Sequence, residues 1–329
     1  MNLNKARSAK VTLFVGSIIS LFSFMIPFSV QADLISEPNP AQQVKAKAKA
    51  SAAYNNSANS MAPKNVQITK TQVKTSETSD YKLSGQFQVS RSTNLVDFQD
   101  GTRSDSIEFL LAPSLKTPIG NFSLKQSYAE NIKDSEDTAN GFSDTSVSYN
   151  RGSYDWAWSS PYILTMTPSV SVVVPISQVS VKKNQLQGAV SAGLSFGIKP
   201  DQLVQADGTW SLMMGLTAGR SFHAYEQDIN GAVLNRYSSN QTLAVGYSIG
   251  DWRFSVQLLN RLRWTYQGNL KTPSFVASQE IGYSINDHFN LAVGHTNEAS
   301  AMKDNGVDSN YNLVDEKTST VYGTIGVAF

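Results

Sequence analysis

The chain has 329 residues, with 27 basic and 26 acidic side chains, no cysteine and a mean hydropathy of −0.25. The near-zero net charge argues against nucleic acid as the main partner, and the absence of cysteine excludes disulfides and thiolate metal sites. The low mean hydropathy excludes a bundle of transmembrane helices. It leaves open a protein that crosses a membrane with strands, because only every second strand residue then faces lipid.

Residues 1–32 have the organisation of a secretory signal peptide. A basic segment precedes an apolar run over residues 11–26, and small side chains before Asp33 supply a cleavage site. The alternative is an uncleaved membrane anchor, but the run is shorter than the roughly 20 residues that a spanning helix needs. We therefore predict a mature chain that begins at Asp33.

Residues 33–80 differ in composition from the rest of the chain. They are rich in lysine, alanine, asparagine and serine and poor in large apolar side chains. Such a segment buries too little apolar surface to offset the conformational entropy that it loses on ordering. We predict a disordered periplasmic arm, and the alternatives are that Val66, Ile68 and Val73 add a short strand or enter the interior of the domain that follows.

From Tyr81 to Phe329 the chain alternates apolar and polar residues in segments separated by turn residues, and no helix is predicted. About twelve strands are expected, within a range of ten to fourteen. Their lengths suit membrane-crossing strands of roughly 9–11 residues. The expected strands are residues 81–91, 105–116, 119–130, 142–150, 160–175, 186–198, 209–222, 238–249, 251–266, 273–285, 287–296 and 318–329.

The expected strand at residues 251–266 shows two distinct faces. Its apolar face has aromatic residues at both ends and Asn260 as its only polar residue, whereas its other face is polar except for Leu259. A soluble sheet has no reason to place tryptophan at both ends, but a membrane strand uses aromatic side chains at both interfaces. Across the domain, the expected interfacial aromatic residues are Trp210, Trp252, Trp264, Tyr266 and Tyr283.

The last nine residues form an alternating strand that ends on Phe329, with Val327 two positions earlier. This stretch resembles the terminal strand of bacterial outer-membrane β-barrels, which typically ends in phenylalanine and is recognised by the barrel-assembly machinery. The resemblance implies an all-β fold, a transmembrane antiparallel up-and-down barrel over residues 81–329. It also implies location in a Gram-negative outer membrane, in contact with its lipid and lipopolysaccharide, with both termini in the periplasm.

The lengths of the connections agree with this topology. Alternate connections near residues 118–120, 250–251 and 286–287 are tight turns, as the periplasmic side of such a barrel requires. The other connections are longer and charged, and the join near residues 151–160 fits neither set. Acidic residues expected in the long connections are Asp134, Glu136, Asp137, Asp144, Glu298, Asp304, Asp308, Asp315 and Glu316. The segment 304–308 resembles the start of a calcium loop, but it lacks the closing glutamate, so we predict no metal site and no cofactor.

The polar faces of the strands are expected to line the interior of the barrel. Small side chains predominate there, which predicts a solvated passage or one that residues 33–80 plug. Arg261 and Arg263 would attract anionic solutes near the outer mouth. The alternative is that the charges pair across the interior, for example Glu280 with Arg253 or Arg261. The expected pore-lining residues are Lys82, Glu108, Lys125, Arg253, Gln257, Arg261, Arg263 and Glu280, with Arg91 as a further inward charge.

A channel for passive diffusion of small hydrophilic solutes, with anions as the finer hypothesis, is the function that these features favour. One alternative is a non-conducting structural or adhesive barrel that acts through its acidic loops. A weaker alternative is a lipid-modifying enzyme, because His295 resembles the histidine of outer-membrane phospholipases. However, Asn297 stands where those enzymes carry the nucleophile, and we predict no catalytic residues. The oligomeric state is not readable from the sequence.

Overall fold

The structure is a computed structural model that describes residues 81–95, 104–133, 140–159, 162–198, 204–205, 208–303 and 308–329. The predicted signal peptide and arm lie outside the described residues. Within the described part of the chain, no helix is long and apolar enough to cross a membrane. The elements are β1 Lys82–Asn94, β2 Asp105–Thr117, β3 Gly120–Lys133, β4 Gly141–Phe142, β5 Thr145–Asn150, β6 Tyr154–Ser159, β7 Tyr162–Val174, the π-helix η2 Val179–Lys183, β8 Leu186–Ile198, β9 Val204–Gln205, β10 Gly208–His223, β11 Asn235–Ile249, β12 Trp252–Thr265, β13 Ser274–Ser284, β14 Phe289–Ser300 and β15 Ser319–Ala328.

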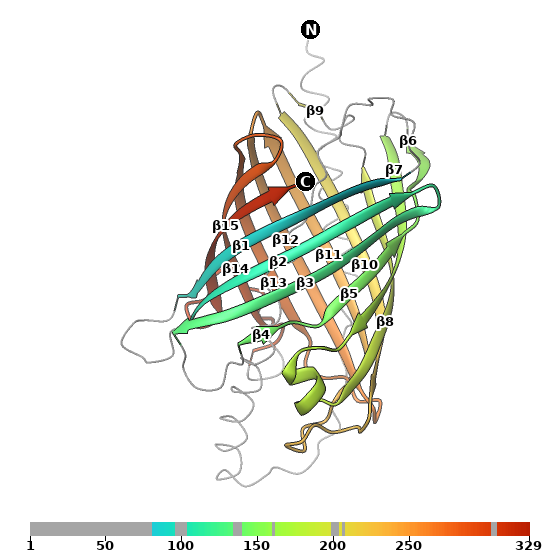
Figure 1. The fold of residues 1–329 in the computed structure, drawn as a ribbon, viewed down its shortest axis with the longest axis vertical. Coiled ribbons are helices and arrows are strands. Elements are labelled where there is room, and N and C mark those ends of the chain that lie inside the picture. The colour runs from blue at the N-terminus through green and yellow to red at the C-terminus, as the bar shows by residue number, and fades with distance from the viewer. Residues whose placement is uncertain are drawn as a thin grey trace. The chain divides into compact units, whose positions relative to one another are not determined.

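Twelve of these strands close into one antiparallel barrel (Figure 1). The order around the barrel is β1, β2, β3, β5, β7, β8, β10, β11, β12, β13, β14 and β15, and β15 pairs with β1 to complete the ring. The remaining short strands add to this ring, since β4 pairs with β3, β6 with β7 and β9 with β10. The predicted fold class and strand count are confirmed.

The alternation of side chains gives the barrel an apolar outer face and a polar inner face. On β12, Trp252 and Val256 are each 50% exposed, and the intervening Arg253 is only partly exposed. The cross-strand register carries the same division around the ring, so that Phe254 pairs with Tyr247 on one side and Ile281 on the other. A closed sheet that exposes its apolar face satisfies every backbone group internally, which is the requirement for β-structure in lipid.

Aromatic pairs gather near both ends of the outer face. Near the short turns, ring centroids lie 4.8 to 4.9 Å apart in three cross-strand pairs: Trp210 with Tyr247, Trp252 with Tyr283, and Phe122 with Tyr149. Toward the opposite end, Tyr128 packs against Phe109 and Phe142. This placement matches the two aromatic girdles of membrane barrels.

The two ends of the barrel differ in their connections. One end, here called the turn end, has the tight turns after β2, β11 and β13 and the C-terminal Phe329. The other end, here called the loop end, has the longer connections, as the alternation of connection lengths predicted. The join that the sequence did not place is a hairpin at the turn end, in which β6 pairs with the first residues of β7.

Asp144 anchors the loop-end connection between β7 and β8. Its Oδ1 accepts hydrogen bonds from the backbone N–H groups of Ile176 and Ser177 at 3.1 and 3.0 Å, and its Oδ2 accepts from the Ser180 hydroxyl at 2.5 Å. These bonds hold η2, a single π-helical turn that the alternation pattern did not predict. Asp144 is therefore a structural residue, because its carboxylate holds neighbouring backbone.

The loop between β14 and β15 explains the polar exception on the apolar face of β12. Tyr311 packs on Phe275 with ring centroids 4.9 Å apart, and its hydroxyl donates to Asn260 Oδ1 at 3.4 Å. Asn297, on the same face, donates through Nδ2 to the Asn312 carbonyl at 2.7 Å. These polar groups lie on the outer face near the loop end, where the loop satisfies them in place of water.

Candidate functional site

The register places the eight predicted pore-lining residues on one face of the sheet, opposite the exposed apolar face. On β12, Arg253, Gln257, Arg261 and Arg263 share this face, and their cross-strand partners are small or polar residues such as Ser248. Lys82, Glu108, Lys125 and Glu280 occupy equivalent positions on β1, β2, β3 and β13. We call this surface the inner wall.

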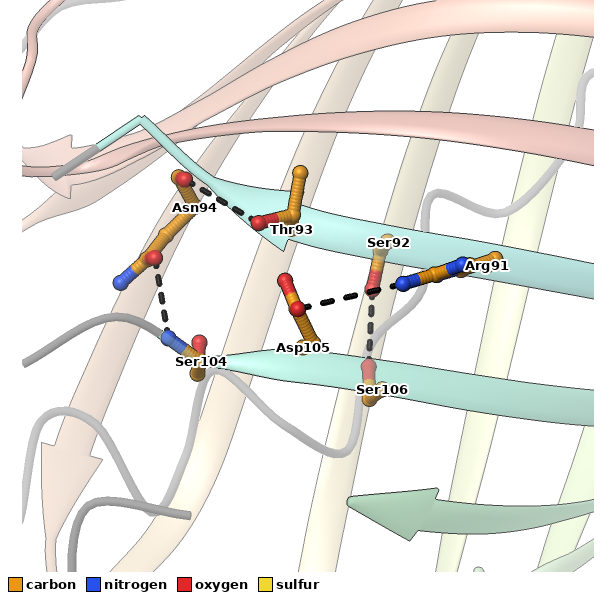
Figure 2. Close-up of polar contacts among 7 residues, drawn as sticks. All are labelled: Arg91, Ser92, Thr93, Asn94, Ser104, Asp105 and Ser106. Atoms are coloured by element: carbon orange, nitrogen blue, oxygen red, sulfur yellow. Dashed lines mark hydrogen bonds and ion pairs between the residues drawn. The ribbon is translucent and has the colours of Figure 1, made fainter. Parts of the chain in front are cut away.

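Arg91 does not belong to the inner wall, so its predicted inward position is wrong. Its position alternates with Ser90 and Ser92, and it shares the outer face with Val89 and Thr93. Its side chain is 68% exposed and lies 4.0 Å from Asp105, beside the hydrogen bond between the hydroxyls of Ser92 and Ser106 (Figure 2). The strict two-residue period of the strand decides its face.

Three residues from β12, β13 and β15 form a connected network on the inner wall. Arg253 Nη2 lies 3.7 Å from Glu280 Oε1, and the Tyr322 hydroxyl donates to Glu280 Oε2 at 2.9 Å. The Tyr322 ring lies against Gly294, where any added Cβ would collide with the ring. Glu280 therefore receives both a cation and a hydroxyl, and the glycine opposite provides the space for the aromatic ring.

A second pair joins β12 and β14 nearer the loop end. Arg261 Nη1 lies 2.5 Å from Glu298 Oε1, and the Arg261 side chain is 6% exposed. Glu298 belongs to β14, so its predicted place in an acidic loop is wrong; the strand continues four residues beyond the predicted end. The charge of Arg261 is neutralised within the wall, as the pairing alternative proposed.

Glu108 and Lys125 face the interior from β2 and β3. Lys125 attracts the Glu108 carboxylate electrostatically, whereas the Ser127 hydroxyl donates to the Ser143 hydroxyl at 2.9 Å. Glu108 pairs directly with Ala129 of β3, so Lys125 approaches its carboxylate diagonally from the same strand. Here too, an acidic side chain on the inner wall lies near a basic side chain of the neighbouring strand.

Basic residues outnumber acidic ones on the inner wall. Among the described side chains of the twelve barrel strands, six basic residues and three acidic residues occupy inner positions. The basic residues are Lys82, Lys116, Lys125, Arg253, Arg261 and Arg263, and the acidic residues are Glu108, Glu280 and Glu298. The described inner positions therefore carry more basic than acidic side chains. The alternation of apolar and polar residues in the sequence predicted the inward position of each of these residues except Lys116 and Glu298.

The predicted aromatic and C-terminal residues take different positions. Trp210, Trp252 and Tyr283 lie in the outer girdle near the turn end, and Trp264 lies near the loop end of β12. Tyr266 instead lies in the hairpin beyond β12, where its hydroxyl contacts the backbone of Ser221 and His223. Phe329 packs against Gly85 of β1 and exchanges two backbone hydrogen bonds with it. Val327 pairs with Phe87 and Phe289.

His295 does not form the hydrogen bond that activates a nucleophile. It lies on the outer face beside Gln279 and Val321, and neither ring nitrogen has a hydrogen-bond partner in the described structure. Asn297 is held by the hydroxyl of Thr318 and the carbonyl of Asn312. No hydroxyl of the described residues therefore lies within hydrogen-bond distance of His295.

A closed twelve-stranded antiparallel ring with an apolar exterior and a polar interior is the fold of the membrane-spanning β-barrels. No protein-family model matches the chain, and no curated protein matches it. Solved structures of similar fold include the NanC porin, at 14% identity and a TM-score of 0.43, covering 74% of this chain and 98% of that one. An outer-membrane channel from Pseudomonas putida F1 has 9% identity and a TM-score of 0.48, covering 78% and 100%. The KdgM porin, solved in complex with oligogalacturonate, has 9% identity and a TM-score of 0.35, covering 75% and 98%. At these sequence identities the similarity concerns the fold alone, and it does not indicate which solute this chain would bind.

Proposed function

We propose that this protein is a channel of the bacterial outer membrane for passive diffusion of small hydrophilic solutes. The observation that carries the proposal is the polar inner wall of a closed barrel of twelve strands, more than the eight whose interior side chains just fill. In this setting the turn end, with Phe329, faces the periplasm and the loop end faces outward. The C-terminal strand with Val327 and Phe329 would be the part that the assembly machinery recognises.

Anionic solutes are the class that the charge of the inner wall favours. Arg261 contributes little to this preference, because Glu298 neutralises it. The preference instead rests on the number of basic residues at the described inner positions, six against three acidic ones. A wall with more positive than negative charge raises the local concentration of anions.

The test is single-channel recording from the refolded mature chain in a planar bilayer. Stable conductance, with a reversal potential under a potassium chloride gradient that indicates chloride preference, is the expected result. Conductance without preference would remove the anionic hypothesis but keep the channel. Absence of conductance from folded protein would contradict the proposed function.

A non-conducting barrel is the second candidate, because part of the inner wall is shielded from solvent. Gln88, Ser278, Thr296, Tyr322 and Thr324 all face the interior from β1 and β13–β15, and each is less than 10% exposed. Recording the mature chain beside a chain that begins at Tyr81 separates the candidates. Conductance in the shorter chain alone would indicate that residues 33–80 close the passage, and silence in both would favour the structural or adhesive barrel.

A further inference from the structure

Two arginines near the loop end share one aromatic ring on β11. The guanidinium carbon of Arg220 lies 5.8 Å from the centroid of the Tyr237 ring, and that of Arg236 lies 5.2 Å from the same centroid. Arg220 also lies 4.9 Å from the Phe222 ring, and Arg236 lies 5.8 Å from the Tyr266 ring. Two guanidinium groups therefore lie within 5.8 Å of the centroid of one aromatic ring, which favours positive charge.

The arginines have no carboxylate partner in the described chain. Among the described residues, neither Arg220 nor Arg236 lies within 4.0 Å of a carboxylate oxygen. Two acids of the connection between β10 and β11 have other partners: Asp228 accepts from the backbone N–H groups of residues 230 and 232, and Glu226 accepts from the side chain of Gln267. Arg236 Nε is buried and has no hydrogen-bond partner.

A β-bulge places Arg236 at this position. The pairing of β11 with β12 shifts register between Asn235 and Tyr237, so Arg236 is the extra residue of the bulge. Regular alternation would direct Arg236 and Tyr237 to opposite faces, but the bulge brings the guanidinium beside the Tyr237 ring. A second register shift, between Phe222 and His223, lies on the neighbouring strand β10. Bulges that redirect a side chain are typical of binding sites.

Arg220 and Tyr237 face the membrane side of the barrel, and the Arg236 guanidinium lies beside the Tyr237 ring. Arg220 pairs with Val190 and Tyr237, and its position alternates with those of Gly219 and Ser221 on the inner wall. It is exposed, as are Phe222 and Tyr237. A soluble anion in the passage would meet the inner wall, whereas an anion on the outer face at the loop end belongs to the outer leaflet.

We propose that Arg220 and Arg236, supported by Tyr237, bind the phosphate groups of lipopolysaccharide at the outer rim of the barrel. Guanidinium groups form paired, charge-assisted hydrogen bonds with phosphate, and the exposed guanidinium of Arg220 has no carboxylate partner among the described residues. Lipid phosphates draw basic side chains to the membrane interface. The inference rests on the part of the proposed function that orients the loop end outward, and not on whether the barrel conducts. Absence of conductance in bilayer recordings would therefore not contradict it.

The experiment measures binding of purified lipid A to the full mature protein in detergent micelles, by native mass spectrometry. The variants are Arg220→Gln, Arg236→Gln and the double variant. Arg91→Gln is the matched control, because Arg91 is also outward and near the loop end but has Asp105 as its partner. Arg220→Lys and Arg236→Lys keep the positive charge but remove the planar guanidinium group. If a glutamine variant does not fold, the lysine variant at the same position is measured in its place.

The expected result is roughly tenfold weaker lipid A binding for each glutamine variant, and unchanged binding for the control, because a charged hydrogen-bond donor is lost. Binding should fall similarly when lipid A is dephosphorylated. Equal binding of phosphorylated and dephosphorylated lipid would overturn the proposal, as would unchanged binding by the double variant. Competition by inorganic phosphate at low millimolar concentration would show a site for free phosphate and would also overturn it.

Discussion

Arg261 on β12 and Glu298 on β14 reach each other across β13, with 2.5 Å between their nearest side-chain nitrogen and oxygen. The two residues of β13 that lie between them, Ser274 and Val276, are themselves buried. The ion pair therefore links β12 to β14 over the intervening strand β13 on the inner wall. It also removes from the mouth of the barrel a charge that would otherwise attract solutes.

Breaking this pair should destabilise the barrel more than breaking the pair between Arg253 and Glu280. Glu298→Gln leaves a buried guanidinium without its counter-charge, which costs about 3 kcal/mol. Arg253→Gln should cost less than about 1 kcal/mol, because Arg253 is 35% exposed and its ion pair is longer. Urea unfolding in lipid vesicles measures both free energies. Equal losses would mean that burial does not strengthen the first pair.

Arg263 should contribute to ion selectivity. It faces the interior near the loop end, opposite Ser238 on β11, so Arg263→Glu places a negative charge in the passage. We expect the reversal potential under a salt gradient to shift toward cations. Arg91→Glu is the control, because Arg91 lies on the outer face. A shift of the same size in both variants would indicate a long-range effect of net charge.

Lys271 should make the stability of the barrel depend on pH. Burial and the nearby positive charge of Arg263 lower the pKa of Lys271 from its ordinary value of 10.5, against the opposing effect of Asp228. The unfolded chain therefore binds more protons than the folded chain between the two pKa values, so this residue makes stability rise with pH across that window.

The Lys271→Met variant provides the measurement for this pH dependence. The difference in unfolding free energy between the wild type and Lys271→Met should shift in favour of the wild type as pH rises toward 10.5. Arg263→Gln should shrink that change, because it removes one cause of the lowered pKa. A difference that is constant with pH would contradict the prediction.

Gly294 should tolerate no side chain. A methyl group there would overlap the Tyr322 ring, whose hydroxyl donates to Glu280. We expect Gly294→Ala to cost about 1–2 kcal/mol, because the ring must move and its hydrogen bond weakens. Gly323→Ala, on the neighbouring strand, is the control, since a Cβ there meets no atom within 4 Å. Similar unfolding midpoints for the two variants would argue against tight packing of the ring.

Asp144 should hold the π-helical turn η2 in place. Asp144→Ala removes the acceptors for the N–H groups of Ile176 and Ser177, and we expect faster hydrogen exchange over residues 176–183. Asp144→Asn keeps one oxygen acceptor and should give a smaller change. Exchange rates for the barrel strands serve as the internal reference. Uniform exchange increases across the whole barrel would instead indicate global destabilisation.

The alternation of side chains predicted most of the fold and part of the site. Strand β12 shows why. In a membrane strand every second residue must be apolar, so Arg253, Arg261 and Arg263, which are separated by even numbers of residues, lie together on the polar face. The end of β14 was less predictable, because Asn297 interrupts the apolar face there and resembles a loop residue. The loop residues that satisfy Asn297 lie fifteen or more positions away.

By itself the sequence determined the closed barrel, the approximate limits of its twelve strands and the face on which most side chains lie. These properties depend on local alternation and on the need of lipid-exposed strands for internal backbone pairing. Only the tertiary structure decided that Glu298 neutralises Arg261, that Tyr322 bonds to Glu280, and that Arg220 and Arg236 share the Tyr237 ring. Each contact depends on the register between strands or on a bulge, and register joins residues that no local pattern connects.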